Sequence, residues 1–118
     1  MYSPKLLDHF QNPRNAGEIA GPDASAEIEN PACGDVLRLA LKLSAGQIVD
    51  AKFKAKGCVA AIACGSALTE LLVGRTIAEA RKLRRDDLHA AVGELPQGSI
   101  HAAQLAIDTL TAAVAVIP

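Results

Sequence analysis

The sequence contains no tryptophan, and aromatic residues make up only 3% of it, although half of its 118 residues are hydrophobic. A folded core must therefore be filled mainly by Ala, Val, Leu and Ile side chains. A chain of this length is long enough to bury such a core. We expect a single domain over residues 1–118.

The sequence also lacks any excess of charge, since its formal net charge is −1. This near balance gives no general attraction to nucleic acid or to an anionic membrane surface. No run reaches the roughly 18 apolar residues of a membrane span. The N-terminal segment contains Asp8 and has no apolar run of the secretory type, so we expect no cleaved leader.

Cysteine is scarce as well, with three residues at wide spacing. An odd number at such spacing is unlike the disulfide framework of a small secreted protein. We therefore expect a reducing compartment, the cytoplasm.

Alternating hydrophobicity predicts three strands in the first half of the chain. Apolar and polar residues alternate over 24–29 and, more clearly, over 37–43. Residues 44–47 have the composition of a hairpin turn, and a returning strand follows over 51–56. Its polar face is either simply solvated or a docking surface for an acidic partner, and it consists of Lys52, Lys54 and Lys56.

Helical spacing, capping residues and helix breakers predict the remaining elements. They are a short helix from Ser3-Pro4 to Asn12-Pro13, a helix from Cys58 to about Val73, a short helix from Thr76 through Lys82 with Arg84-Arg85 near its end, a short turn from Asp86-Asp87, and a helix from Ser99 nearly to Pro118. Sequential strands joined by tight turns, together with these helices, predict an α+β fold. Its small three-stranded antiparallel sheet would carry helices on one face.

Four side chains that can bind metal lie at the ends of these predicted elements. Cys33 and Asp35 flank Gly34 in a turn, Cys58 stands where a strand gives way to a helix, and His101 lies in the first turn of the last helix. A helix N-terminus should stabilise a thiolate at Cys58 and a neutral, metal-binding imidazole at His101. The four donors could complete a tetrahedral zinc site or hold a two-iron cluster, and their residue types favour neither. The alternative is a small reduced protein with incidental cysteines.

The third cysteine, Cys64, falls in the apolar stripe of its predicted helix. We therefore expect it to be buried as a small hydrophobic residue and not to be a ligand. The same helix has a polar stripe that includes Ser66, Thr69 and Glu70. Asp8, His9 and His89 stand alone in the sequence, and no chemistry is assigned to them.

Four segments occur in a fixed order: DHFQNPRNAG at 8–17, PACGDV at 31–36, FKAKGC at 53–58 followed by AIA at 61–63, and TE at 69–70. Together they resemble the U-type iron–sulfur cluster assembly scaffolds, the IscU and NifU N-terminal family, over nearly the whole chain. The resemblance implies an α+β domain, not itself an enzyme, that receives iron and persulfide sulfur, assembles a transient [2Fe-2S] cluster and passes it to recipient apoproteins. It also implies that zinc can fill the same site. The family's ligand positions match Cys33, Asp35, Cys58 and His101.

The sequence departs from the family at two places. The family has a cysteine, its usual sulfur acceptor, directly after the histidine, whereas Ala102 stands here. This weakens the implied partnership with a cysteine desulfurase. The family segment Leu-Pro-Pro-Val-Lys, which an Hsp70-type chaperone grips, is replaced by Leu-Pro-Gln-Gly-Ser at 95–99, which argues against chaperone binding.

The sequence thus predicts a scaffold protein that binds iron or zinc and a labile [2Fe-2S] cluster for transfer to apoproteins. One alternative is a divergent paralogue that binds zinc or iron as a carrier or regulator and assembles no cluster. Another is a zinc-dependent, sulfurtransferase-like protein that relays persulfide through Cys58 or Cys33. The missing thiol at Ala102 counts against the relay more than against metal binding.

Overall fold

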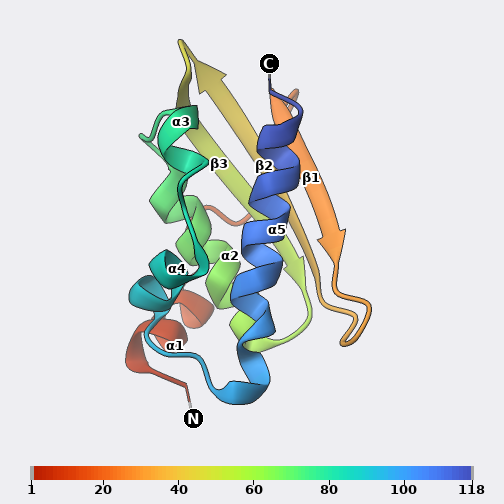
Figure 1. The fold of residues 1–118 in the computed structure, drawn as a ribbon, viewed down its shortest axis with the longest axis vertical. Helices are drawn as coiled ribbons and strands as arrows, with labels where there is room; N and C mark the ends of the chain where they lie inside the picture. Colours follow the sequence, from red (N-terminus) through yellow and green to blue (C-terminus); the bar gives the residue numbers. More distant parts are fainter. Residues whose placement is uncertain (1, 118) are drawn as a thin grey trace.

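The computed structural model describes residues 2–117 (Figure 1). Met1 and Pro118, the ends of the predicted domain, lie outside the described residues. The strands β1 (Ala24–Glu29), β2 (Val36–Ser44) and β3 (Gln47–Lys56) form one antiparallel sheet in that order. The helical elements are α1 (Pro4–Gln11), α2 (Val59–Leu72), α3 (Ile77–Ala80), α4 (Arg85–Val92), the short 3₁₀ helix η1 (Gln97–Ser99) and α5 (His101–Ala115). The predicted α+β fold with a three-stranded antiparallel sheet is confirmed.

The sheet follows from the alternation of its strands. Leu37, Leu39 and Leu41 of β2 are buried on the face that α2 and α5 cover, whereas Arg38 and Lys42 are exposed. In the register of β3, Ala55, Phe53 and Ala51 lie opposite the three leucines. The turn between the strands has positive φ at Ala45 (52°) and Gly46 (77°), as a two-residue hairpin turn requires.

Helix α2 fits closely against the sheet because its residues are small. A Cβ added at Gly65 would lie only 2.6 Å from Cδ2 of Phe53, so the phenyl ring rests directly on the helix backbone. The alanines of α2 that are buried beside this contact are Ala60, Ala61, Ala63 and Ala67. Small side chains at a close helix–sheet contact thus supply the core that a sequence poor in aromatics needs.

The predicted starts of α1 and α3 are confirmed at their capping residues. The Ser3 hydroxyl accepts a hydrogen bond from the Leu6 amide, and Pro4 occupies the first turn of α1. Thr76 and Glu79 form a reciprocal capping box at α3. Such caps satisfy amides that have no partner within the helix.

The segment after α3 differs from the prediction. The α3 helix ends at Ala80 and not at Lys82, and a full helix, α4, replaces the expected short turn. Its start is fixed by the Arg84 amide, which donates to the Asp87 carboxylate at 2.8 Å. Burial of the Leu88 and Val92 side chains, one helical turn apart, then holds α4 against the core.

The start of the last helix is also shifted. Residues up to Ser99 form η1, and α5 begins at His101, so Ser99 does not cap it as expected. The α5 face formed by Ala103, Ala106 and Leu110 is buried, whereas Ile107 is half-buried. Among the described residues, no helix combines the length and the apolar character needed to cross a bilayer.

Candidate metal centre

Three of the four predicted ligands lie in one cluster. Cys33 is in the turn between β1 and β2, Asp35 immediately precedes β2, and His101 is the first residue of α5. Their potential ligand atoms lie within 4.8 Å of one another. Asp35 is buried, Cys33 is exposed and the His101 side chain is 39% exposed, so the cluster opens to solvent on one side.

The turn that carries Cys33 is folded around Asn30. The Asn30 carbonyl accepts from the amides of Cys33 (3.3 Å) and Gly34 (2.7 Å), and its side-chain oxygen accepts from Ala32 N at 3.0 Å. The Asn30 amide donates to the Asp35 carbonyl at 2.7 Å, which closes the turn into the β1–β2 pair. Gly34 has a φ of 75°, a left-handed conformation that glycine adopts without strain. This local folding brings Cys33 and Asp35 to the same end of the sheet.

The carboxylate of Asp35 joins the fourth predicted ligand to this cluster. Its Oδ1 accepts from the Cys58 amide at 3.1 Å, and its Oδ2 accepts from the Cys58 thiol at 3.1 Å. The same Oδ2 lies 3.8 Å from Nε2 of His101. Cys58 is not part of the mutually close set of Cys33, Asp35 and His101, and it reaches that set through Asp35.

This contact between segments requires a glycine before Cys58. Gly57 has a φ of 143°, and an added Cβ would lie 2.0 Å from Oδ1 of Asp35. Any side chain at this position would occupy the space of the Asp35 carboxylate. The Gly57-Cys58 pair of the sequence is therefore explained by the close approach of Asp35 to the backbone.

The protonation of Cys58 differs from the expectation. Burial is the main factor that raises the pKa of the Cys58 thiol, and the neighbouring Asp35 carboxylate raises it further. The Ala61 amide, which donates to Sγ at 3.4 Å, lowers the pKa as the predicted helix N-terminus should, but its effect is smaller. The helix N-terminus thus favours the thiolate as expected, but burial and Asp35 outweigh its effect and raise the pKa of Cys58 overall. A metal that binds Cys58 must displace its proton.

The donor set suits a metal that accepts sulfur and nitrogen ligands. Cysteine and histidine ligands are typical of zinc sites, and mixed cysteine and histidine ligation of two-iron clusters exists. The arrangement could hold one such group with ligands from Cys33, Asp35, Cys58 and His101. His101 shares its helix face with Gln104 and the exposed Asp108, and the Gln104 side-chain amide donates to Asp108 at 2.7 Å.

Two neighbouring positions do not add a donor. Cys64 is fully buried, as predicted, and burial raises the pKa of its thiol to about 12. Ala102 follows His101 and is only 1% exposed, so the position at which the resemblance implies a cysteine is enclosed by protein here. Neither residue supplies a solvent-accessible thiol.

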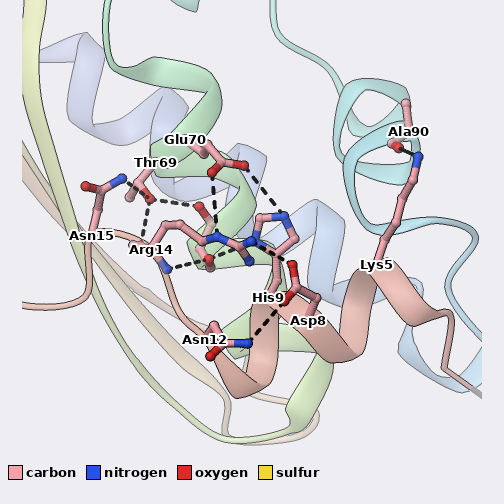
Figure 2. A network of polar contacts seen from close by, with 10 residues as sticks. Lys5, Asp8, His9, Asn12, Arg14, Asn15, Thr69, Glu70 and Ala90 are labelled. Atoms are coloured by element: carbon pink, nitrogen blue, oxygen red, sulfur yellow. Dashed lines mark hydrogen bonds and ion pairs between the residues drawn. The ribbon is translucent and has the colours of Figure 1, made fainter.

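A buried polar network between α1 and α2 was not predicted from the sequence (Figure 2). His9 is buried, its Nδ1 lies 2.8 Å from the Ser66 hydroxyl, and its Nε2 lies 3.8 Å from the Glu70 carboxylate. The Arg14 amide donates to the Ser66 hydroxyl at 2.8 Å, and its guanidinium pairs with Asp8 at 2.6 Å and with Glu70 at 3.6 Å. The expectation that Asp8 and His9 stand alone is therefore wrong.

The same network corrects the interpretation of the polar stripe of α2. Ser66 and Thr69 are fully buried because α1 and residues 12–17 cover them. The Thr69 hydroxyl lies within hydrogen-bond distance, as donor, of the carbonyls of Ser66 (2.8 Å) and Arg14 (3.2 Å), and the Asn15 side-chain amide donates to that hydroxyl at 3.3 Å. The signal in the sequence was the run of polar residues at 8–15, which includes Asp8, His9 and Arg14. These residues fasten α1 to α2 and lie outside the candidate metal centre.

Comparison with known proteins places this geometry in context. The family model described as "NifU-like N terminal domain" matches residues 1–117. The iron–sulfur cluster assembly scaffold protein IscU 1 of Archaeoglobus fulgidus is 46% identical over 114 residues, which covers 97% of this chain and 74% of that protein. The iron–sulfur cluster assembly scaffold protein IscU of Escherichia coli K12 is 42% identical over 118 residues, covering 97% and 91%.

Solved structures show the same fold. A putative iron–sulfur cluster assembly scaffold protein for the SUF system from Fervidobacterium islandicum superposes with a TM-score of 0.78 at 21% identity, and 96% of each chain is covered. The N-terminal part of a NifU-like protein from Brucella abortus superposes with a TM-score of 0.75 at 22% identity, covering 96% of this chain and 91% of the other. At these identities the likeness establishes the arrangement of helices and strands.

Proposed function

The chain belongs to the NifU-like N-terminal domain family, and from this premise we propose that it is an iron–sulfur cluster assembly scaffold. It binds iron, holds a labile [2Fe-2S] cluster as cargo and passes the cluster to recipient apoproteins, without catalysing a reaction of its own. The full 1–118 chain acts as one domain in the cytoplasm. The names of the relatives from A. fulgidus and E. coli support this role.

The observation that carries the proposal is the position of the Asp35 carboxylate. It is buried, accepts from the Cys58 thiol and lies 3.8 Å from Nε2 of His101, while Cys33 stands within the same small cluster. A buried carboxylate between a thiol and an imidazole is a suitable centre for binding a cation. We infer that Cys33, Asp35, Cys58 and His101 are the ligands.

This donor set favours delivery over permanent storage. Oxygen and nitrogen donors hold a cluster less tightly than thiolates do. Cys33 is exposed and His101 is partly exposed, so an incoming ligand from a recipient could replace them first. Asp35 and Cys58 lie deeper and would retain the cargo until that exchange.

The enclosed Ala102 favours a second candidate function. The family's usual acceptor of sulfur from a cysteine desulfurase is a thiol at this position, and Ala102 has none. Sulfur transfer from such a desulfurase to this protein is therefore expected to be inefficient. The same four ligands would then hold zinc or iron in a carrier or regulator that builds no cluster. A zinc-dependent persulfide relay through Cys58 or Cys33 depends more on the missing thiol and is less well supported. The 95–99 segment likewise argues against an Hsp70-type chaperone as partner.

The test compares the natural protein with Ala102→Cys. Both are supplied with ferric iron and sulfide without oxygen, and separately with ferrous iron, cysteine, a desulfurase and a dithiol as reductant. Visible absorption and Mössbauer spectroscopy then measure cluster yield and lifetime. The natural protein should form a labile two-iron cluster and bind zinc stably, and Ala102→Cys should raise both yield and lifetime because it adds a thiolate. Ala103→Cys, at the adjacent and equally buried position, is the matched control and should change neither.

Two outcomes would contradict parts of this proposal. If neither the natural protein nor folded Ala102→Cys forms a cluster while both bind zinc, the metal-binding carrier or regulator replaces the scaffold. If the natural protein accepts desulfurase sulfur as well as Ala102→Cys does, the argument from the missing cysteine is wrong. Circular dichroism establishes that each variant is folded.

A further inference from the structure

The two edges of the sheet differ in their backbone hydrogen bonding to other segments of the chain. The β3 edge is covered, because Phe53 exchanges backbone hydrogen bonds with Asn15 (3.0 Å) and Gly17 (2.9 Å). Further along, Ile48 does the same with Arg75 and Gly74, both at 2.8 Å. Within residues 2–117, no segment pairs in this way with the outer edge of β1, the last strand on its side of the sheet (Figure 1).

The register identifies which backbone groups of β1 are free. The Asn30 amide donates to Asp35 across the pair, and hydrogen-bonded positions alternate along an antiparallel strand. The N–H and C=O groups of Ser25, Glu27 and Glu29 therefore point away from β2. The hydrogen bonds found over residues 2–117 include none to these groups. Such an edge can accept an added strand.

A groove leads from this edge to the candidate metal centre. A cavity of about 210 Å³ lies between the end of β1 and the first turns of α5. Ile28 and Leu105 supply apolar walls, and His101 is also part of the lining. A strand added beside β1 would therefore place side chains in this groove and direct one end toward His101.

The charges of the groove select the kind of strand. Its lining contains the carboxylates of Glu29 and Asp108 and no lysine or arginine. Glu27 is exposed on the same edge, although Arg38 lies opposite it across the β1–β2 pair and offsets its charge. Two copies of β1 paired antiparallel would bring glutamates of both chains together, which is unfavourable. A basic partner strand is favoured.

We propose that the β1 edge and this groove dock an extended, basic segment of a recipient protein as a fourth strand of the sheet. The inference rests on the proposed function, since docking here would bring the recipient's own ligands beside His101 and the exposed Cys33. Backbone hydrogen bonds to Ser25, Glu27 and Glu29 would hold the segment, and Glu29 and Asp108 would select lysine or arginine side chains. The glutamates of β1 disfavour pairing of this edge with a second copy of the chain.

The test uses a fluorescein-labelled peptide, Lys-Val-Lys-Thr-Lys-Val-Lys, and the acidic peptide Glu-Val-Glu-Thr-Glu-Val-Glu. Fluorescence anisotropy measures binding to the metal-free and the zinc-loaded protein. Ser25→Pro removes an outward N–H, and Asp108→Asn removes a groove charge; each should weaken binding of the basic peptide by about tenfold. Ser25→Ala and Asp86→Asn, which changes an exposed carboxylate in α4, are matched controls and should leave binding unchanged.

Amide hydrogen exchange locates the peptide. Bound basic peptide should slow exchange at Ser25, Glu27 and Glu29. The proposal is overturned if the basic peptide does not bind, if both peptides bind equally, if folded Asp108→Asn binds as the natural protein does, or if the protected edge belongs to a dimer of this chain in sedimentation experiments. Peptide binding is measured on the metal-free protein as well, so the two proposals can fail separately. A natural protein that binds zinc but does not bind the basic peptide overturns only the docking surface. Peptide binding without any metal or cluster binding overturns only the scaffold function.

Discussion

Asp35 and Cys64 represent two opposite uses of a side chain in this protein. Asp35 is a charged residue that the fold buries but supplies with partners, the amide and thiol of Cys58. Cys64 is a reactive residue type that the fold surrounds with apolar side chains, so that its thiol stays protonated. The type of a residue therefore says less about its role than the position in which the fold places it.

We predict that Cys64→Ser destabilises the protein without affecting metal binding. A hydroxyl left unpaired in this core position should lower the free energy of unfolding by about 1 kcal/mol or more, measured by urea denaturation. Zinc stoichiometry should stay the same. Cys33→Ser is the opposite control, because Cys33 is exposed and its loss should weaken zinc binding at unchanged stability. Loss of metal from a folded Cys64→Ser protein would show that the assignment of the cysteines is wrong.

Local sequence predicted the burial of Cys64 but not the protonation of Cys58. The helical face of Cys64 follows from the residues three and four positions away, which the sequence displays. The thiol of Cys58 is controlled by its burial and by Asp35, which comes from a different segment. Contacts of this kind depend on tertiary packing, and residue spacing does not reveal them.

At the scale of elements, the joint between α1 and α2 combines the apolar packing of Leu6 with buried polar contacts. His9 of α1 and the Arg14 amide both meet the hydroxyl of Ser66, in the middle of α2. Buried polar groups that lose a partner are costly, so this joint is sensitive to the charge state of its members.

We predict that this joint weakens in acid. Burial lowers the pKa of His9 below its usual value of 6.5, so the unfolded chain binds a proton more readily than the folded protein. The contribution is fully present above about pH 6.5 and is lost as the pH falls through the lower, folded-state pKa. The thermal midpoint of the natural protein should therefore drop more between about pH 7.5 and pH 5 than that of His9→Gln.

His89→Gln serves as the control for this experiment, because His89 makes none of the contacts of the α1–α2 joint. Its thermal midpoint should fall with pH as steeply as that of the natural protein. An equal slope for His9→Gln would contradict the assigned role of His9.

The strands were predictable and the later helices less so. The alternation of 24–29 and 37–43 and the turn at 44–47 predicted the three strands and their faces. The pairing has a register shift between Lys42 and Leu43, and β3 begins at Gln47 and not at residue 51, neither of which the alternation indicates. The start of α4 depends on one contact between Arg84 and Asp87, and the polar stripe of α2 is buried by residues about fifty positions earlier in the chain. Neither feature has a periodic signal.

At the scale of the whole molecule, the candidate ligands come from three separate segments. Cys33 and Asp35 precede β2, Cys58 caps α2 and His101 begins α5. A metal bound to all four would connect the sheet with both of its covering helices. It would therefore bind the folded chain far better than the unfolded one.

We predict that zinc stabilises the fold by mass action. Free zinc at 100 times its dissociation constant should add about 2.7 kcal/mol to the free energy of unfolding, seen as a higher thermal midpoint in calorimetry. A chelator should reverse the shift. Cys58→Ser should remove most of it, whereas Cys64→Ser should retain it at a lower baseline. A thermal midpoint that does not respond to zinc would contradict the four-ligand site.

The position of His101 on α5 has a consequence for the newly made chain. The helix that begins with this imidazole also supplies Ala103, Ala106 and Leu110 to the core. During synthesis both thiols and the carboxylate of Asp35 emerge earlier than His101, while the sheet still lacks its α5 cover. His101 is held beside Asp35 only once α5 packs on the sheet, so the four donors would be brought together only on a chain whose core has closed, and a nascent chain should bind a metal more weakly than the folded protein.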